Sequence, residues 1–436
     1  MIFELSPLWG LLPLLLYIIL SFRGMDMIWV VLLCVILGGV LTGTSPIAFG
    51  NAIAAGLGSF MGLIGFIILI GAGLGEVLVR AGVAPTVVYK VMNSVGIKSQ
   101  SQAMIATLVT STVIVALLGT MAGGNAILAP ILIPIMATLR IKPATLGVLL
   151  HGGGAAGLFV GPFVPPVVAT LQLAKVDYLS YILWAGAPGA LIVLVVTFVL
   201  CLRLQKQEDD NEYYSDSDMI ENSEFTPTPS SQRATAVFLI FMVCALGYGI
   251  WAKAGASYVL VVMGLAALIV GWVVGWKPGE TLATLIQGGS KMYWLFFLFV
   301  LYDPFLYFIT KTGAFDAIAV LLNPLINFGG STMFMISSSI IGIFGVSGAA
   351  VAQAKVMNEM FAPMVAQLKF PPHLWAIVLL LGSQMTSFVY PTGDMIGQMG
   401  LARSKNLKAM LYTGVCITIC TIIYIILVAL LYPFAG

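Results

Sequence analysis

Long apolar runs joined by short polar connectors make up most of the chain. A helix that crosses a bilayer needs about 20 apolar residues, so the longer runs predict membrane-spanning helices. An uncharged segment rich in Gly and Ala, residues 44–58, predicts an arm along the membrane surface. The predicted spans lie near residues 5–22, 26–42, 59–80 and 178–202 in the first half, and near 234–251, 257–275, 290–310 and 409–432 in the second.

Residues 103–139 carry no charge, but their two apolar arms are short for full spans. Between the arms lies the Gly-rich polar sequence GTMAGGN, Gly119–Asn125. Irregular backbone at membrane depth is tolerated only where protein buries it or where it lines a wet cavity. The pattern therefore predicts a re-entrant helical hairpin at about residues 102–140. Two short, tilted spans joined by a Gly turn are the alternative.

The next apolar run, at about residues 144–175, is too long for one straight span. It contains the sequence GPFVPP at Gly161–Pro166. Proline removes a backbone donor and fixes φ, and the residue before a proline avoids the helical region. The run therefore predicts a helix that is broken at this sequence.

The second half of the chain repeats the first. PIMATLRIKP at Pro134–Pro143 aligns with PMVAQLKFPP at Pro363–Pro372, an offset of 229, and the same offset places GPFVPP opposite YPTGDM at Tyr390–Met395. This alignment predicts a second hairpin at about 331–367 and a second broken helix at about 373–402. Internal duplication of this length is typical of secondary transporters. Since each half has five spans, an odd number, the two repeats are expected to be inverted in the membrane.

A polar segment, residues 204–232, separates the two repeats at 1–203 and 233–436. It contains eight acidic residues, several serines and two Thr-Pro pairs. Such a composition cannot bury enough apolar surface to fold alone. The segment is therefore predicted to be a disordered, acidic cytoplasmic linker.

The composition agrees with a membrane protein: 60% of the residues are hydrophobic, 8% are charged, and the mean hydropathy is +1.07. So few charges cannot cover a water-soluble protein of 436 residues. The predicted fold is an all-α polytopic membrane protein with two inverted repeats, each of five transmembrane helices plus a re-entrant hairpin and a broken helix. The five cysteines lie in apolar runs without metal-ligand spacing, and no basic block indicates nucleic acid, so no metal, cofactor or nucleic-acid partner is expected.

The basic residues predict the orientation. With both termini outside, fourteen of the 19 lysines and arginines lie on the cytoplasmic side, four lie outside, and Lys355 lies in the second hairpin. Because positive residues favour the cytoplasmic side, this arrangement predicts a multi-pass protein of the cell inner membrane with a cytoplasmic linker. The four lysines expected outside are Lys175, Lys253, Lys311 and Lys369.

The two hairpin tips and the two helix breaks are expected to meet near the bilayer midplane. The N-termini of half-helices present free N–H groups and a partial positive charge, which suit an anion, and freed carbonyl groups suit a cation. The predicted substrate-binding residues are Thr120, Gly123, Gly124, Asn125, Gly161, Pro162, Ser347, Gly348, Gln353, Lys355, Thr392 and Gly393.

Ionisable side chains at membrane depth are expected to face a cavity or a partner, because a charge near the bilayer centre costs roughly 2.5–3.5 kcal/mol on insertion scales. Lys355 is predicted either to supply a positive charge near the substrate or to form an ion pair with Asp394 or Glu359. Asp394, Glu359 and His151 are the candidate coupling-ion residues; a hydrogen-bonded core histidine is the alternative for His151.

Two further charged sequences have local interpretations. Glu76 and Arg80 are spaced i, i+4 near a helix end and predict a local ion pair. Asp303-Pro304 lies inside a predicted span and predicts either a second proton site or a kink.

Several segments resemble known families of carriers. GAGLGEVLVRAGVA (Gly71–Ala84) and HGGGAAGLFVGPFVPPVVAT (His151–Thr170) resemble segments of gluconate permeases. PILIPIMATLRIKPA (Pro130–Ala144) followed by GLFVGPFVPP resembles the large membrane subunit of TRAP transporters. YPTGDMIGQMGLARSKNLKAMLYTG (Tyr390–Gly414) resembles citrate-type carriers. Outside the linker, most of the chain thus resembles the ion transporter superfamily of secondary carriers.

This resemblance implies an elevator-type carrier, often a homodimer, that imports organic anions with protons or sodium. The expected function is proton-coupled symport of a small carboxylate. The alternatives are a sodium/proton antiporter of the same superfamily and a TRAP membrane subunit, which would need a small membrane partner and a soluble binding protein. No phosphate loop, HExxH or GxSxG sequence occurs in the chain, so an enzyme is not expected.

Overall fold

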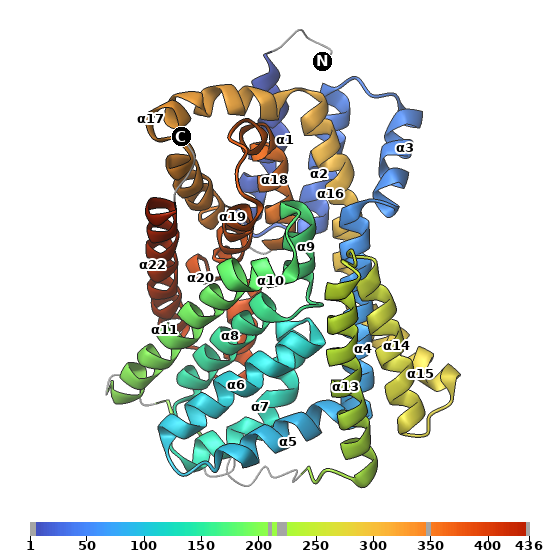
Figure 1. Ribbon diagram of the computed structural model, residues 1–436, viewed down its shortest axis with the longest axis vertical. Coiled ribbons are helices and arrows are strands. Elements are labelled where there is room, and N and C mark those ends of the chain that lie inside the picture. Colours follow the sequence, from blue (N-terminus) through green and yellow to red (C-terminus); the bar gives the residue numbers. More distant parts are fainter. Residues whose placement is uncertain (1–5, 208–211, 216–224, 346–349, 433–436) are drawn as a thin grey trace.

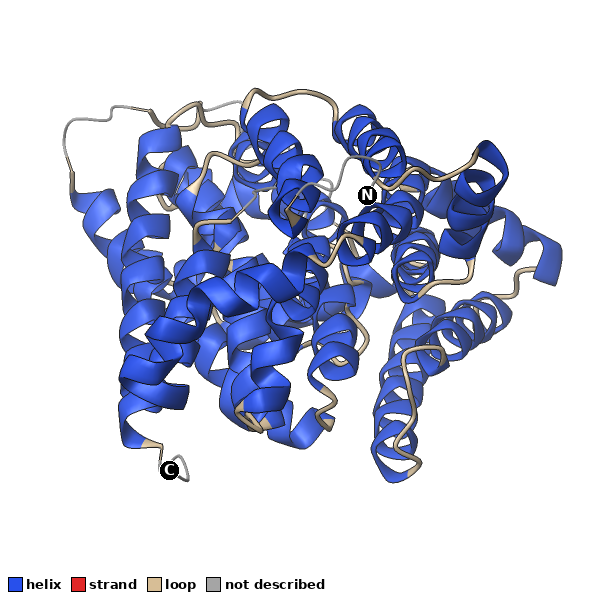
Figure 2. Ribbon diagram, turned by 90° about the horizontal axis from the view of Figure 1, so that it is seen from above, coloured by secondary structure: helices blue, strands red, loops and turns tan. Residues whose placement is uncertain are grey.

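The computed structural model of the chain describes residues 6–207, 212–215, 225–345 and 350–432. Within these ranges every regular element is a helix, and Figure 2 shows helices joined by loops and turns without a strand. Nine of the helices described are long and apolar enough to cross a membrane. The prediction of an all-α polytopic membrane protein is therefore confirmed.

The helices of the first half begin with three short elements and end with the long helix α11. The predicted surface arm forms the helix α3. In order, the elements are η1 (Pro7–Leu11), α1 (Leu12–Phe22), α2 (Met27–Leu41), α3 (Pro46–Leu57), α4 (Phe60–Arg80), α5 (Val83–Val95), α6 (Gln100–Leu118), α7 (Met121–Thr138), α8 (Pro143–Val160), α9 (Pro165–Ala174), α10 (Tyr178–Tyr181), the π-helix η2 (Ile182–Gly186) and α11 (Ala187–Lys206).

The second half follows a similar order, and both termini lie toward the same end of the molecule in Figure 1. Gly330 has φ 56° and ψ −145° inside α17, a conformation open to glycine, so α17 consists of two helices joined at a kink. The elements are α13 (Pro229–Trp251), α14 (Tyr258–Val273), α15 (Pro278–Ser290), α16 (Tyr293–Lys311), α17 (Ala314–Ile343), α18 (Ala350–Gln367), α19 (Pro372–Gln384), α20 (Thr386–Val389), α21 (Gly393–Leu401) and α22 (Leu407–Leu431).

Several helices of each half of the chain pack against helices of the other half. α4 packs against α16, and the short helix preceding each of them crosses to the other half: α3 packs on α16, and α15 packs on α4. Similarly, α8 packs against α21 while α19 packs against α9, and α7 contacts α21 while α18 contacts α9. In Figure 1, α4, α13, α14 and α15 form one flank, and α11, α20 and α22 lie on the opposite flank. The sequence pattern did not predict α15.

The predicted first hairpin corresponds to α6 and α7, which contain 19 and 18 residues. At 1.5 Å per residue each arm is about 27–29 Å long. The hydrocarbon core of a bilayer is about 30 Å thick, so this length fits either a deep hairpin or two tilted spans. Three other predicted spans, at 5–22, 26–42 and 257–275, form apolar helices of 10–17 residues.

Glycines on α8 allow α6 to approach very closely. Thr112 Oγ1 donates a hydrogen bond of 3.1 Å to the carbonyl oxygen of Gly153 across this interface. Small residues spaced by four are the usual means of close helix packing in membranes. A Cβ atom on Gly153, Gly157 or Gly161 would lie 2.9, 2.5 or 2.8 Å from the carbonyl oxygens of Leu108, Thr112 and Ala116, respectively.

Within the predicted linker, residues 212–215 lie between segments outside the described ranges, and they contact the folded chain. The hydroxyl of Tyr214 donates to the carbonyl oxygen of Ala402 at 2.8 Å, and Ser404 Oγ donates to a carboxylate oxygen of Glu212 at 2.7 Å. The ammonium of Lys142 lies 5.9 Å from the centre of the Tyr213 ring. Residues 212–215 thus contact the beginning of α8 and the turn between α21 and α22.

Gly157→Ala tests the close approach of α6 and α8. Alanine normally stabilises a helix interior relative to glycine by about 1 kcal/mol. At this position the new methyl group would force the two helices apart, and overpacking costs about 1–3 kcal/mol. We expect a lower free energy of unfolding in detergent micelles. Gly264→Ala on α14, where no atom lies within 4 Å of the added Cβ, is the matched control and should not destabilise; equal stability of both variants would contradict the packing.

Candidate functional site

The N-terminus of α7 lies at the tip of the predicted first hairpin. Gly119 ends α6 with φ 73°, and its N–H donates to the carbonyl oxygen of Val115 at 2.8 Å. Thr120 then caps α7, because its Oγ1 accepts a hydrogen bond of 3.2 Å from the N–H of Gly123. Met121 and Ala122 occupy the first two helical positions, whose N–H groups have no partner within a helix. Ala122 and Gly123 are exposed.

The N-terminus of α21 follows the second helix break and has the same design. Thr392 Oγ1 accepts a hydrogen bond of 3.3 Å from the N–H of Met395. Gly393 and Asp394 occupy the first two helical positions, and both are exposed. A Cβ on Gly393 would have no atom within 4 Å, so this end of α21 faces open space. The carboxylate of Asp394 lies beside the positive end of its own helix dipole.

A buried hydrogen-bond junction joins α7 to α21. Asn125 is fully buried, and its amide nitrogen donates to Gln398 Oε1 at 2.7 Å and to the carbonyl oxygen of Leu150 on α8 at 2.8 Å. Its amide oxygen accepts a hydrogen bond of 2.7 Å from Ser111 Oγ on α6. These bonds engage both ends of the Asn125 amide within the protein. The side chain is therefore suited to holding four helices in register.

Contacts along α8 give the relative direction of α7 and α21. Gly147 faces Met399, and Leu150 contacts both helices through the Asn125 junction. Gly154, one turn further along α8, faces Met121. Both helices thus run opposite to α8 and parallel to each other. Since Met121 and Gly393 precede the junction by four and five residues, at 1.5 Å per residue the two N-termini lie at about the same level.

At the first helix break, more backbone groups have hydrogen-bond partners than the sequence suggested. Gly161 and Pro162 follow α8, whose last carbonyl groups accept hydrogen bonds from two tyrosines. The hydroxyl of Tyr181 donates to Phe159 at 2.8 Å, and that of Tyr178 donates to Val160 at 2.6 Å. The helix after the break, α9, begins with Pro165 and Pro166, which have no N–H. This break therefore offers fewer free donors and acceptors than the N-termini of α7 and α21.

Part of the second hairpin tip lies outside the described residues, including the predicted site residues Ser347 and Gly348. On the adjoining described backbone, Gln353 Nε2 donates to the carbonyl oxygen of Gly342 at 3.4 Å. The hydroxyl of Tyr390, in the second break, donates to the carbonyl oxygen of Phe344 at 3.1 Å. Gln353 and Tyr390 therefore both contact the end of α17.

Lys355 forms an ion pair with Glu359 on the same helix, with 2.5 Å between Nζ and Oε1. This is one of the two pairings expected for Lys355; among the described residues no salt bridge joins it to Asp394. Asp303 on α16 interacts electrostatically with both members of the pair, and the Ser59 hydroxyl lies within hydrogen-bonding reach of its carboxylate. The structure thus places Asp303 of α16 near the Lys355–Glu359 ion pair of α18. The sequence pattern did not predict this arrangement.

His151 lies away from the two N-termini, on the face of α8 next to α20. It is 1% exposed, and its ring packs edge-on against Phe388 with 4.8 Å between ring centres. Its Nε2 has no hydrogen-bond partner in the part of the chain that the structure describes. The burial of His151 agrees with the alternative of a core histidine, but no hydrogen bond at Nε2 supports that alternative within the described residues, and the coupling-ion role stays a prediction.

The predicted Glu76–Arg80 ion pair is confirmed, with 2.8 Å between Nε and Oε1. Glu76 also pairs with Lys291 at 2.7 Å, and Arg80 donates to Gln287 Oε1 at 2.8 Å. Gln287 belongs to α15, so this network fastens the short helix of the second half to α4.

These features first define a class of protein. A polytopic helical chain in which one long apolar helix is broken and two capped helix N-termini lie at one level resembles a secondary transporter in architecture. A model of the GntP permease family matches residues 8–246, which is more than half of the chain. The protein belongs to the GntP family of permeases, and its resemblance to gluconate permeases and the ion transporter superfamily is confirmed at this level.

A solved structure shares the fold. The crystal structure of the YdaH transporter of Alcanivorax borkumensis, described as having an unusual topology, superposes with a TM-score of 0.59. The match covers 92% of this chain and 96% of that chain at 12% sequence identity. At this identity the likeness supports the fold alone. No curated protein gives a significant sequence match.

The junction between Asn125 and Gln398 can be tested by a double-mutant cycle on the free energy of unfolding in mixed micelles. We expect Asn125→Ala and Gln398→Ala to be non-additive by about 0.6–1.7 kcal/mol, the range for side-chain hydrogen bonds inside membrane proteins. Asn125→Ala combined with Gln353→Ala, which share no contact, should be additive within about 0.5 kcal/mol. Additivity in the first pair would show that the junction does not couple α7 to α21.

Proposed function

We propose that the protein imports a small organic anion, a carboxylate, together with protons. The observation that favours this function is the pair of helix N-termini, α7 and α21, which are parallel, begin at the same level and are each capped by a threonine. The first two N–H groups of each helix, at Met121 and Ala122 and at Gly393 and Asp394, have no partner within the helix. Two aligned helix dipoles with unpaired donors favour a negatively charged group.

Asp394 supports coupling to protons. Its carboxylate occupies the second position of α21, where it already interacts with the positive end of the helix. A bound anion at the same end would be repelled by an ionised Asp394, because like charges at close range destabilise each other. Protonation of Asp394 removes this repulsion, so anion and proton are expected to bind together. Lys355 and Glu359, with Asp303, are a second set of groups that could exchange a proton.

An elevator movement is the mechanism that we favour. α4 and α16, together with α3 and α15, would form a fixed scaffold, and the hairpins with the broken helices would move as one unit. The exchanged packing of the two halves supports two repeats related by an inverting pseudo-two-fold axis, which is common in carriers that work by alternating access. The Asn125 junction would keep α7, α8 and α21 together during such a movement.

The test is uptake by the purified protein in liposomes. We expect a pH gradient alone to drive accumulation of at least one labelled carboxylate, with no requirement for sodium. Asp394→Asn should abolish accumulation driven by the pH gradient while retaining exchange of internal for external substrate, because a permanently neutral residue still permits anion binding. Glu280→Gln, which changes an exposed carboxylate of α15 outside the site, is the control and should accumulate substrate like the unchanged protein.

Three outcomes would contradict the proposal. Sodium-driven proton movement without uptake of any acid would indicate a sodium/proton antiporter. Uptake only after addition of a soluble binding protein and a small membrane protein would indicate a TRAP membrane subunit. Accumulation driven by the pH gradient in Asp394→Asn, at the rate of the unchanged protein, would remove Asp394 from the coupling mechanism.

A further inference from the structure

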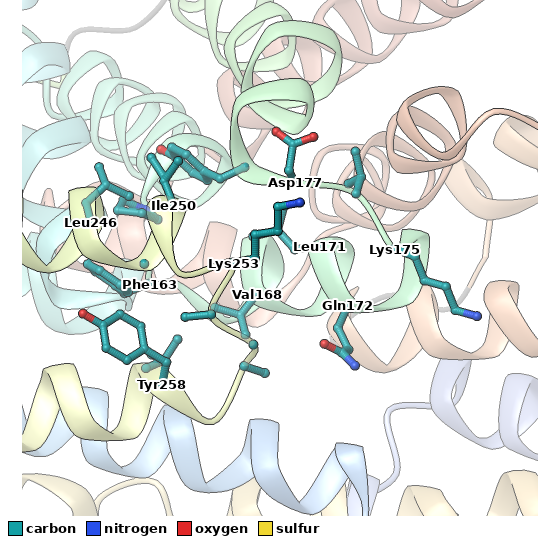
Figure 3. Close-up of a pocket in the computed structure, with 18 residues that line it drawn as sticks. Phe163, Val168, Leu171, Gln172, Lys175, Asp177, Leu246, Ile250, Lys253 and Tyr258 are labelled. Atoms are coloured by element: carbon teal, nitrogen blue, oxygen red, sulfur yellow. The ribbon is translucent and has the colours of Figure 1, made fainter.

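A cavity of about 650 Å³ lies beside the first helix break, and its lining includes no residue of α7 or α21. One wall comes from Pro162 and Phe163 in the first break and from α9; the other comes from α13, α14 and the loop between them. Figure 3 shows Phe163 and Val168 facing Leu246, Ile250 and Tyr258 across this space. Its volume falls within the ~300–1,000 Å³ typical of small-molecule sites.

Two lysines lie at the rim of the cavity, one on each wall. Lys175 follows α9 and Lys253 follows α13, and both are exposed. In Figure 3 the Lys253 side chain extends toward the Asp177 loop, whereas Lys175 lies at the other end of the cavity beyond Gln172. Neither lysine forms a salt bridge with a residue that the structure describes. Their charges are thus available to a ligand.

The backbone at these two lysines is unusual. Lys175 and Lys253 have φ values of 53° and 49°, in the left-handed region that glycine prefers. At the offset of 229 that relates the two halves, Lys253 corresponds to Gly24, which has φ 73°. The same turn is therefore formed by glycine in the first half and by a cationic residue where it borders the cavity.

The one carboxylate in the lining is already engaged. Asp177 caps α10, where its two carboxylate oxygens accept hydrogen bonds from the Ser180 hydroxyl at 2.6 Å and from the Ser180 N–H at 2.9 Å. These bonds hold the pKa of Asp177 below its ordinary value, first through the hydroxyl and then through the backbone N–H. With two lysines against one capped carboxylate, the lining has a net positive charge.

We propose that this cavity is a second binding site, for an organic acid with an apolar body. Its acid group would lie at the rim beside Lys253, and its apolar body would lie between Val168, Leu246 and Tyr258. The ammonium of Lys175, at the other end of the cavity, would add to the positive potential there. A polyhydroxylated acid fits poorly, because most of the wall offers no hydrogen-bond partners for hydroxyl groups. The shared chemistry of a free fatty acid and an acidic phospholipid, one anionic head on an aliphatic chain, fits both parts of the cavity.

Binding of octanoate to the purified full-length chain, in nanodiscs of zwitterionic lipid and without any gradient, tests this site. We expect saturable binding by calorimetry that weakens about tenfold or more in Lys253→Gln, which removes the charge-assisted contact, and that weakens less in Lys175→Gln. Leu246→Trp should also abolish binding by filling the apolar part. Lys369→Gln is the matched control, because Lys369 is another exposed lysine with φ 46° but does not line the cavity.

The outcomes are separable from those of the transport assay. Equal octanoate binding in all variants, or no saturable binding to the unchanged protein, would overturn the proposal. Octanoate binding that is lost only when the nanodiscs contain phosphatidylglycerol would support the site and identify acidic lipid as its resident occupant. Retained binding in phosphatidylglycerol would support a free acid instead. Because no step of this assay requires transport, it remains decisive even if the protein carries no carboxylate.

Discussion

A helix that ends inside a bilayer leaves backbone groups that water does not reach, and the rest of this structure depends on how those groups are satisfied. The protein uses two different solutions. At the first break, tyrosine hydroxyls bond the last carbonyl groups of α8, and two prolines remove the N–H groups that would otherwise begin α9. At α7 and α21, each threonine cap bonds only one N–H and leaves the first two groups free. The starts of α7 and α21 therefore keep unpaired donors that the start of α9 lacks.

The position of those two ends depends on α8. Its glycines let α6 approach to backbone distance, so that Ser111 of α6 reaches Asn125, and the carbonyl group of Leu150 completes the junction with Gln398. In a membrane, where apolar side chains gain little by leaving lipid, such close packing and buried hydrogen bonds are the main forces that hold helices together. The glycines of α8 are thus explained by helix packing. They affect the site indirectly, because they let α6 approach and so position Asn125.

Local sequence signals predicted where helices begin and end better than they predicted the contacts between helices. Gly119 and the Pro165-Pro166 pair identified the tip and the break because these residues restrict the backbone wherever they occur. The parallel arrangement of α7 and α21 could not be predicted, since it depends on residues as far apart as Asn125 and Gln398. Likewise, Tyr178 and Tyr181 have no local feature that marks them as partners of α8. The Lys355–Glu359 pair was open to prediction from its i, i+4 spacing, whereas the approach of Asp303 from another helix was not.

The turns that follow several helices contain basic residues with positive φ, and some of these residues occur at equivalent positions in the two halves. Among the described residues, each non-glycine with positive φ is basic: Arg140, Lys175, Lys253, Lys369 and Arg403. Arg140 and Lys369 are 229 positions apart, and Lys175 and Arg403 are 228 apart, so two of these turns occur at equivalent places in both halves. A cation at a helix C-terminus is favoured by the dipole, which offsets part of the strain of the left-handed backbone. Because the repeats are expected to be inverted, equivalent turns would face opposite sides of the membrane, so each side would carry a basic residue at such a turn.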